Sequence, residues 1–172
     1  MSTIIATIET DVSKHSITFE IEKEKINLFM KKNKVFKFRL KPTLEQQQYF
    51  QQCFGATRFI WNKMLGDRIE YYQEYKQALK NTPAMYKDEF TWLREVDSLA
   101  LSNVQMQLQT AFKNFFTQPR VGYPNFKSKK HSRKTYTTNN INGSIRLEGK
   151  YIKLPKIGLV EIILHRQIPK NC

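Results

Sequence analysis

Residues 34–40, KVFKFRL, interleave apolar side chains with Lys37 and Arg39, and this alternation predicts a half-buried strand with a basic outer face. A single strand cannot bury its apolar face alone, so partner strands are required elsewhere in the chain. Short strand-like stretches return near the end of the chain, where Gly149 marks a tight turn. These later strands are predicted at residues 144–148, 150–154 and 159–164.

The apolar spacing between these strands follows the period of helices. Pro42 ends the first strand, and Thr43 with Gln46 forms a capping box that begins a helix. Gly55 predicts the end of this helix and a turn before the next one. The following helices are predicted at residues 56–79, 90–96 and 98–116, the last one capped by Asp97 or Ser98. The pattern therefore predicts an α+β protein in which a helical block is inserted, after the first strand, into a small β-barrel or sheet.

Residues 1–29 differ in composition from the rest, because they carry three basic and five acidic side chains. Alternation over residues 17–22 predicts one edge strand there. Met30 and the basic residues after it read like a natural N-terminus, so we expect translation to begin at Met30 and residues 1–29 to be a leader of doubtful origin. The alternative is a genuine extra hairpin, and the intact mass of the native protein tests the choice.

The formal net charge of +14 is concentrated in one part of the chain. Between Arg120 and Lys156 there are ten basic side chains and a single acidic one, Glu148. A segment of this charge needs a polyanion as its partner. A membrane surface would require an amphipathic basic helix, whereas this run is broken by Gly, Pro, Ser and Asn. We therefore expect nucleic acid and no membrane as the partner and, since no apolar run is long enough to span a bilayer, a cytoplasmic, nucleoid-associated location.

The cysteines and histidines predict no metal site. Cys53 and Cys172 are too few for a disulfide framework or a zinc centre. Cys53 lies in a helical apolar pattern and is expected to be a small buried hydrophobe. His15, His131 and His165 are scattered, without spacing that would bring two of them to one helical face.

The segment 111–130, AFKNFFTQPRVGYPNFKSKK, carries aromatic rings interleaved with cations, the combination that stacks bases and neutralises phosphates together. Tyr123 and Phe126 are expected either to stack on bases or to plug the end of the barrel. The basic residues here are expected to contact the nucleic-acid backbone, the alternative being an ordinary solvated face. They are Lys127, Lys129, Lys130, Arg133 and Lys134.

Three motifs occur in order along the chain. The first is FGATRFIWNKML at residues 54–65. The second combines WLREVDS at 92–98 with AFKNFF at 111–116, and the third combines GYPNFK at 122–127 with LPKIG at 154–158. In this order and spacing they resemble the TnpB (OrfB) proteins of bacterial insertion sequences, which are RNA-guided DNA endonucleases ancestral to the type V CRISPR effectors.

The resemblance covers nearly all of residues 30–169. It implies a wedge-type, oligonucleotide-binding-like β-barrel with a helical recognition bundle inserted after its first strand. In the family these parts bind a guide RNA and help to read a short motif in double-stranded DNA beside the target, so both nucleic acids are expected partners. The implied division is a leader at 1–29, a first barrel strand at 30–42, a bundle at 43–118 that starts with a helix-turn-helix, and a basic turn region with the remaining strands at 119–172.

The family's chemistry lies in a nuclease domain of ribonuclease-H type, in which carboxylates hold two metal ions and a four-cysteine zinc ribbon is inserted. This chain stops at Cys172, where the link to that domain should begin, and it has no Cys-x-x-Cys. We therefore expect the magnesium and zinc sites in a missing half, no cofactor in this chain and no enzymatic activity of this chain alone. Cleavage of a guide-matched target with magnesium would contradict this expectation.

The resemblance also implies roles for single residues. Arg58 and Asn62 are expected to hydrogen-bond phosphates or the guide, although Asn62 alternatively ties down the turn between the first two helices. Ser102 stands where relatives often have glutamine, and Met106 where a basic residue is sometimes found, so motif reading is expected to be altered or lost. Ser98, Ser102, Thr137, Thr138, Asn139 and Asn140 are expected at base edges, and Arg39 and Lys63 complete the expected nucleic-acid-binding set.

The leading hypothesis is a nucleic-acid-binding N-terminal part of a TnpB-like protein, truncated before the catalytic domain. Its nuclease half could be encoded separately. The alternatives are a stand-alone RNA- or DNA-binding regulator derived from a transposon, a non-functional remnant, and a general RNA-binding protein of ribosomal type. The last would show no preference for transposon-end RNA over bulk RNA.

Overall fold

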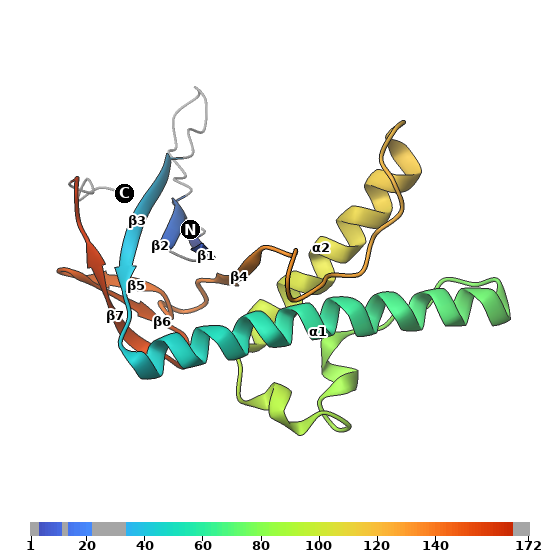
Figure 1. Ribbon diagram of the computed structural model, residues 1–172, viewed down its shortest axis with the longest axis horizontal. Coiled ribbons are helices and arrows are strands. Elements are labelled where there is room, and N and C mark those ends of the chain that lie inside the picture. The colour runs from blue at the N-terminus through green and yellow to red at the C-terminus, as the bar shows by residue number, and fades with distance from the viewer. Residues whose placement is uncertain (1–3, 12–13, 22–33, 167–172) are drawn as a thin grey trace. The chain divides into compact units, whose positions relative to one another are not determined.

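The computed structural model describes residues 4–11, 14–21 and 34–166, which form two compact units. The sheet unit combines the residues before Gln52 with those after Ser132. The helical unit is Gln52–Ser132. Helix α1, Leu44–Tyr75, begins in the sheet unit and continues into the helical unit (Figure 1). The chain is therefore an α+β protein, as predicted, with its helical part inserted in the sequence of the sheet part. The insertion follows β3, however, and not the first strand as expected, because β1 and β2 precede β3 in the same sheet.

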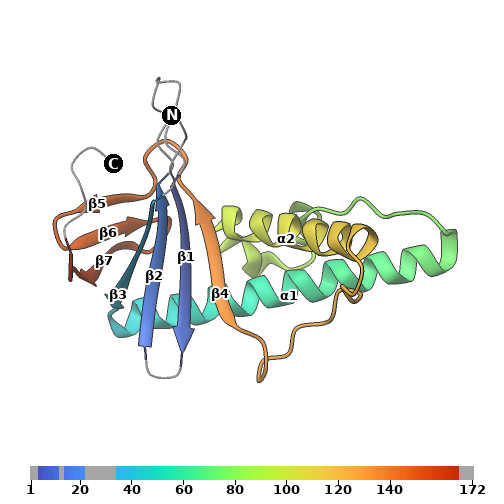
Figure 2. The same cartoon turned by 90° about the horizontal axis from the view of Figure 1, so that it is seen from above.

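The described strands of the sheet unit form one seven-stranded sheet with the order β4-β1-β2-β3-β7-β6-β5. Every neighbouring pair is antiparallel. Strands β4, β1, β2 and β3 run side by side, and β5 to β7 turn away from them (Figure 2). The bounds are β1 Ile4–Asp11, β2 Lys14–Ile21, β3 Lys34–Lys41, β4 Lys134–Asn139, β5 Arg146–Glu148, β6 Tyr151–Leu154 and β7 Gly158–Ile163.

The strand alternation predicted for residues 34–40 is confirmed in β3. Phe36, Phe38 and Leu40 are buried, whereas Lys37 and Arg39 are exposed. Opposite residues of an antiparallel pair share a face, and Leu40 of β3 is opposite the buried Ile162 of β7. The buried face also receives apolar side chains from β6 and β7 and the first turns of α1, including Ile152, Leu154, Val160, Ile162 and Phe50. This face is the core of the sheet unit.

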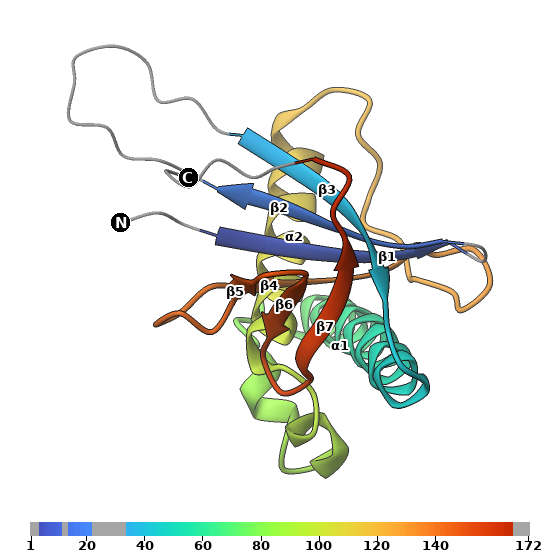
Figure 3. The ribbon, with the colours of Figure 1, turned by 90° about the vertical axis from the view of Figure 1, so that its left-hand side faces the viewer.

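The N-terminal hairpin differs from the expectation. Strands β1 and β2 both pair on two sides, β2 with β1 and β3, and β1 with β2 and β4 (Figure 3). The prediction of a single edge strand at residues 17–22 was therefore wrong, because two strands lie inside the sheet. The physical reason is that backbone N–H and C=O groups along β3 and β4 need partners, which the hairpin supplies. The expected start at Met30 lies outside the described residues. That residues 1–29 are a leader of doubtful origin stays a prediction.

Helix α1 begins at the predicted capping box. The Thr43 backbone N–H donates to Gln46 Oε1 at 3.0 Å, and the Gln46 N–H donates to Thr43 Oγ1 at 3.3 Å. Gln46 Nε2 also donates to the Leu159 carbonyl at 2.8 Å and so ties the start of the helix to β7. The end of the strand and the start of the helix are thus defined by local sequence.

Replacing Thr43 with alanine is expected to lower the free energy of unfolding by about 1 kcal/mol, because the hydroxyl that accepts from the first turn is lost. Chemical denaturation of the full chain measures the change. Thr82→Ala is the matched control, since Thr82 occupies an N-cap position without a side-chain cap bond. Equal losses in both variants would contradict the role of the capping box.

Gly55 does not end a helix. Residues 44–75 form one unbroken helix, so the predicted turn and second helix start were wrong. A glycine inside a helix costs about 1 kcal/mol relative to alanine, but this cost is small beside the burial of its neighbours. Cys53, Phe54 and Ala56 are all buried around it. Tertiary packing therefore outweighs the local preference, and the burial of Cys53 confirms its expected role.

The helical unit contains the rest of α1, two short 3-10 helices and α2, Ser98–Thr117. The 3-10 helices are η1, Pro83–Tyr86, and η2, Thr91–Arg94. Helix α2 is capped by Asp97, whose carboxylate accepts from the Leu99 N–H at 3.0 Å. Its predicted start and end are confirmed within two residues. No described helix is long and apolar enough to pass through a bilayer.

Candidate nucleic-acid interface

The aromatic and basic segment that follows α2 runs back along α2 and across α1 (Figure 1). Asn62 of α1 makes two hydrogen bonds to the backbone of this segment, both at Lys127. It accepts from the Lys127 N–H at 2.7 Å and donates to the Lys127 carbonyl at 2.9 Å. Trp61 Nε1 donates to the Asn125 carbonyl at 2.9 Å. Two adjacent α1 side chains therefore hold residues 125–127 in a fixed backbone position. Asn62 therefore has the structural role predicted as its alternative, but it holds the segment around Lys127 and not a turn between two helices.

Lys127 does not stand free in solvent. Its ammonium lies 3.8 Å from the centroid of the Trp61 ring, a cation–π contact, and burial lowers the pKa of this lysine. The structure thus gives Lys127 an intramolecular partner, and the phosphate contact expected from the sequence stays a prediction. This partner results from the Asn62 tie, which directs the residue toward α1.

The basic tip of the segment follows directly. The Ser128 hydroxyl accepts from the His131 N–H at 3.0 Å, and the Ser132 N–H donates to the Ser128 carbonyl at 3.1 Å, which closes a turn. Lys129 and Lys130 lie within this turn, and both are exposed. The sequence prediction of accessible cations therefore applies to these two lysines, which we call the basic tip.

Aromatic side chains line the segment before the tip. The Tyr123 ring meets Phe112 and Phe115 of α2 edge-on, at centroid distances of 5.5 and 5.2 Å. Burial raises the pKa of the Tyr123 hydroxyl, and Arg68 opposes this shift. Phe126 is 59% exposed. Of the two rings expected to stack on bases, Phe126 is the more accessible, because the Tyr123 ring packs against Phe112 and Phe115 of α2.

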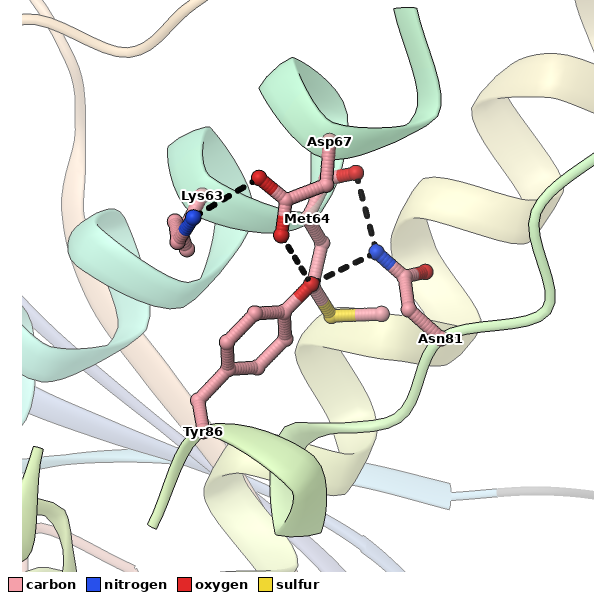
Figure 4. A network of polar contacts seen from close by, with 5 residues as sticks. All are labelled: Lys63, Met64, Asp67, Asn81 and Tyr86. Atoms are coloured by element: carbon pink, nitrogen blue, oxygen red, sulfur yellow. Dashed lines mark hydrogen bonds and ion pairs between the residues drawn. The ribbon is translucent and has the colours of Figure 1, made fainter. Parts of the chain in front are cut away.

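A polar network fixes the chain between α1 and α2 (Figure 4). Asp67 accepts from the Tyr86 hydroxyl at 2.7 Å and from Lys63 Nζ at 2.8 Å. Asn81 Nδ2 donates to the Tyr86 oxygen at 2.7 Å and to the Met64 carbonyl at 3.2 Å. Burial, followed by the bond to Asp67, raises the pKa of Tyr86. The bond to Asp67 raises the pKa of Lys63. Lys63, predicted as a nucleic-acid contact, is therefore part of an internal ion pair.

The other predicted residues of the helical unit lie at its surface. Ser98, Ser102 and Met106 are exposed and follow one another at steps of one helical turn on α2. Ser98 Oγ accepts from Lys87 Nζ at 2.8 Å, and Ser102 Oγ donates to the Ser98 carbonyl at 3.1 Å. The structure thus brings these three residues together on one helical face.

The predicted residues of the sheet unit divide by strand alternation. Thr138 is fully buried, because β4 directs Tyr136 and Thr138 toward the core. Its expected contact with base edges is therefore excluded in this fold. Asn140 Oδ1 accepts from the Ile145 N–H at 2.9 Å and closes the following turn. The remaining predicted residues are exposed or half-buried, and they are Arg39, Arg133, Lys134, Thr137 and Asn139.

The outer face of the sheet contains residues that the sequence prediction missed. Tyr151 and Arg146 are exposed there together with Arg39 and Lys41. Lys150 Nζ lies 5.4 Å from the centroid of the Tyr151 ring and pairs with Glu161 at 3.0 Å. The alternation of exposed and buried side chains in Tyr151–Leu154 could have indicated this face. The strand order that brings β6 and β3 into one sheet, however, could not be read from the sequence.

Five carboxylates of the described residues are engaged by this chain's own groups. Asp67 pairs with Lys63, Asp88 with Arg94, Glu148 with Arg146 and Glu161 with Lys150. Asp97 caps α2. Among the described residues, no group of three or more His, Cys, Asp or Glu side chains is placed to hold a metal ion.

Sequence comparisons relate this chain to known proteins. A family model described as a helix-turn-helix domain, of the OrfB and IS605 type, matches residues 30–77. The described part of that match is β3 and the unbroken helix α1. A protein of Streptomyces pristinaespiralis named "Putative RNA-guided DNA endonuclease" is 36% identical over 107 residues, or 58% of this chain and 26% of the relative.

Two further relatives extend the comparison. The "Putative RNA-guided DNA endonuclease InsQ" of Escherichia coli K12 is 28% identical over 146 residues, or 81% of this chain and 36% of InsQ. The virulence protein VsdF of Salmonella dublin is 31% identical over 103 residues, or 51% of this chain and 87% of VsdF. The matched region thus spans about a quarter to a third of the two endonuclease-named relatives.

The helix-turn-helix match and the relatives define a DNA-binding, transposase-related class of protein. Within that class, the chain belongs to the TnpB (OrfB) family of insertion-sequence proteins.

Proposed function

We propose that the chain binds a guide RNA and the double-stranded DNA beside the RNA's target, as the nucleic-acid-binding part of a TnpB-type RNA-guided DNA endonuclease. The observation that carries the proposal is the basic tip, Lys129 and Lys130, presented by a backbone that Asn62 and Trp61 hold in place. A preformed backbone lowers the entropic cost of ordering these cations against phosphates. In the same proposal, the curled sheet is a wedge-type, oligonucleotide-binding-like barrel.

DNA reading is assigned to the exposed α2 face of Ser98, Ser102 and Met106. Separately, Thr137 and Asn139 of β4 are assigned contacts with base edges. Hydroxyl and amide groups donate to and accept from base edges, whereas the apolar side chain of Met106 does neither. We therefore propose weak base discrimination at the position that Met106 faces. We also propose that the chain itself binds without cutting, and five of its described carboxylates serve as ion-pair partners or caps. Cleavage of a guide-matched DNA by the purified chain with magnesium would contradict that part of the proposal.

A stand-alone binding protein is the second candidate function. It is favoured by VsdF, because the matched region covers 87% of that relative. Under this alternative the chain binds transposon-end RNA without a nuclease partner. Sequencing the RNA that co-purifies with the native protein separates both candidates from a general RNA-binding protein, which would carry bulk RNA.

Salt dependence tests the phosphate contacts directly. If at least four phosphates are neutralised, the logarithm of the association constant for single-stranded RNA should fall with a slope of about −3 against the logarithm of the salt concentration. Filter binding or fluorescence anisotropy from about 50 to 200 mM salt measures the slope. A flat profile would contradict the electrostatic interface.

A further inference from the structure

A hollow of about 440 Å³ lies on the helical unit, apart from the basic tip. One wall is the first part of α1 within this unit, with Gly55, Arg58 and Phe59. The other wall is η2 and the turn after it, with Trp92 and Glu95. An aromatic ring, a cation and a carboxylate therefore surround one concave site.

Gly55 has no packing reason to be a glycine. A Cβ atom built at this position meets no atom within 4 Å, apart from its own helical neighbourhood. Gly55 also lies within a regular helix, where alanine is preferred. Because this residue lines the hollow, the missing Cβ leaves one wall open to an occupant.

Arg58 and Glu95 line the same hollow without neutralising each other. In the described part of the chain, neither the Arg58 guanidinium nor the Glu95 carboxylate has a hydrogen-bond or ion-pair partner. A guanidinium readily binds phosphate, and a carboxylate accepts from N–H groups. The two groups together suit a ligand that carries both an anion and N–H donors.

Trp92 offers a surface for stacking. Its side chain is 41% exposed, and Phe59 meets it edge-on at a centroid distance of 5.2 Å. Phe59 is itself held edge-on by Phe90 at 4.7 Å. The indole is therefore supported from one side while much of it stays accessible, as a base-stacking ring requires.

We propose that this hollow binds one unstacked nucleotide of single-stranded RNA. The base stacks on Trp92, Arg58 contacts its phosphate, and Glu95 accepts a hydrogen bond from an N–H group of the base. This inference rests on the proposed nucleic-acid-binding function and adds a specific nucleotide site to it. The basic tip supplies affinity that depends on salt, whereas the hollow supplies stacking, which depends little on salt.

The test is Gly55→Ala in the full chain, titrated with an eight-nucleotide single-stranded RNA while tryptophan fluorescence is followed. The added methyl group enters the hollow, so affinity is expected to fall about fivefold or more, comparable to part of the stacking contribution of one base. The melting temperature is expected to rise by about 2–4 °C, because alanine favours the helix. A variant that is more stable and yet binds more weakly cannot be explained by misfolding.

Gly66→Ala is the matched control, because it is another glycine of α1, and a Cβ there would lie at an ordinary contact distance of 3.9 Å from the Phe126 ring. It is expected to keep the wild-type affinity. Trp92→Leu should abolish the fluorescence change and weaken binding about tenfold. A duplex of the same sequence should cause no such change, since its bases are already stacked.

Unchanged affinity in both Gly55→Ala and Trp92→Leu would overturn the hollow as a nucleotide site, as would equal quenching by duplex RNA. In that case the salt-dependent binding of longer RNA would remain, and the proposed function would stand. Absence of any RNA binding by the wild-type chain would instead overturn the proposed function and the nucleotide site together.

Discussion

Asn62→Leu is expected to lower the free energy of unfolding by about 2–4 kcal/mol. The leucine side chain can neither donate to the Lys127 carbonyl nor accept from the Lys127 N–H, so both part-buried backbone groups lose their partner. Each unsatisfied buried group costs about 1–3 kcal/mol. Urea denaturation followed by tryptophan fluorescence and circular dichroism measures the loss.

The same variant should also bind RNA more weakly, because the backbone that presents the basic tip is no longer held. Gln48→Leu is the control, since Gln48 is an exposed residue of the same helix and the same substitution there should change stability by less than about 0.5 kcal/mol. Asn62→Leu with wild-type stability and wild-type affinity would show that the tie has no structural role.

The second large effect is expected from reversing the charge of the basic tip. Lys129→Glu combined with Lys130→Glu should weaken RNA binding about 10- to 100-fold near physiological salt, because two cations are lost and two anions then face the phosphates. The salt slope should also become shallower by about 1.4, the value for two phosphates of a single strand. Stability should be nearly unchanged, since both lysines are exposed.

Lys76→Glu combined with Lys80→Glu is the matched control. It removes the same amount of positive charge from two exposed lysines at and beyond the end of α1. If this variant loses as much affinity as the basic-tip variant, binding follows net charge alone and the basic tip is not a site. Anisotropy titrations of both variants with the same RNA decide between these outcomes.

Local chemistry explains why several elements could be predicted. The Thr43 and Gln46 capping box involves residues three apart, and Asp97 caps a helix that begins beside it. The alternation in β3 needs only a period of two. Gly149 and Gly158 adopt the positive φ angles of 58° and 78° that favour glycine in tight turns. In each case the signal lies within a few residues of the structure it predicts.

The predictions that failed depend on partners far away in the sequence. Gly55 was predicted to end a helix because glycine lowers helix stability locally. The burial of Cys53, Phe54 and Ala56, which outweighs this cost, depends on distant segments of the chain. The sequence also did not show that Trp61, 66 positions before Lys127, lies beneath the Lys127 ammonium. Thr138 carries a suitable hydroxyl, yet its strand directs it into the core.

The sequence by itself determined the α+β class, the main helix and strand starts, the concentration of positive charge after α2 and the family to which the chain belongs. These features follow from periodicity and capping, which involve residues close together in the sequence, and from composition and motifs, which do not depend on the three-dimensional structure. Only the tertiary structure decided which cations remain accessible, how the N-terminal hairpin joins β3 to β4, and that Gly55, Arg58 and Trp92 share one hollow. Those outcomes follow from long-range packing and strand pairing, where burial energy exceeds the local preferences that a sequence pattern records.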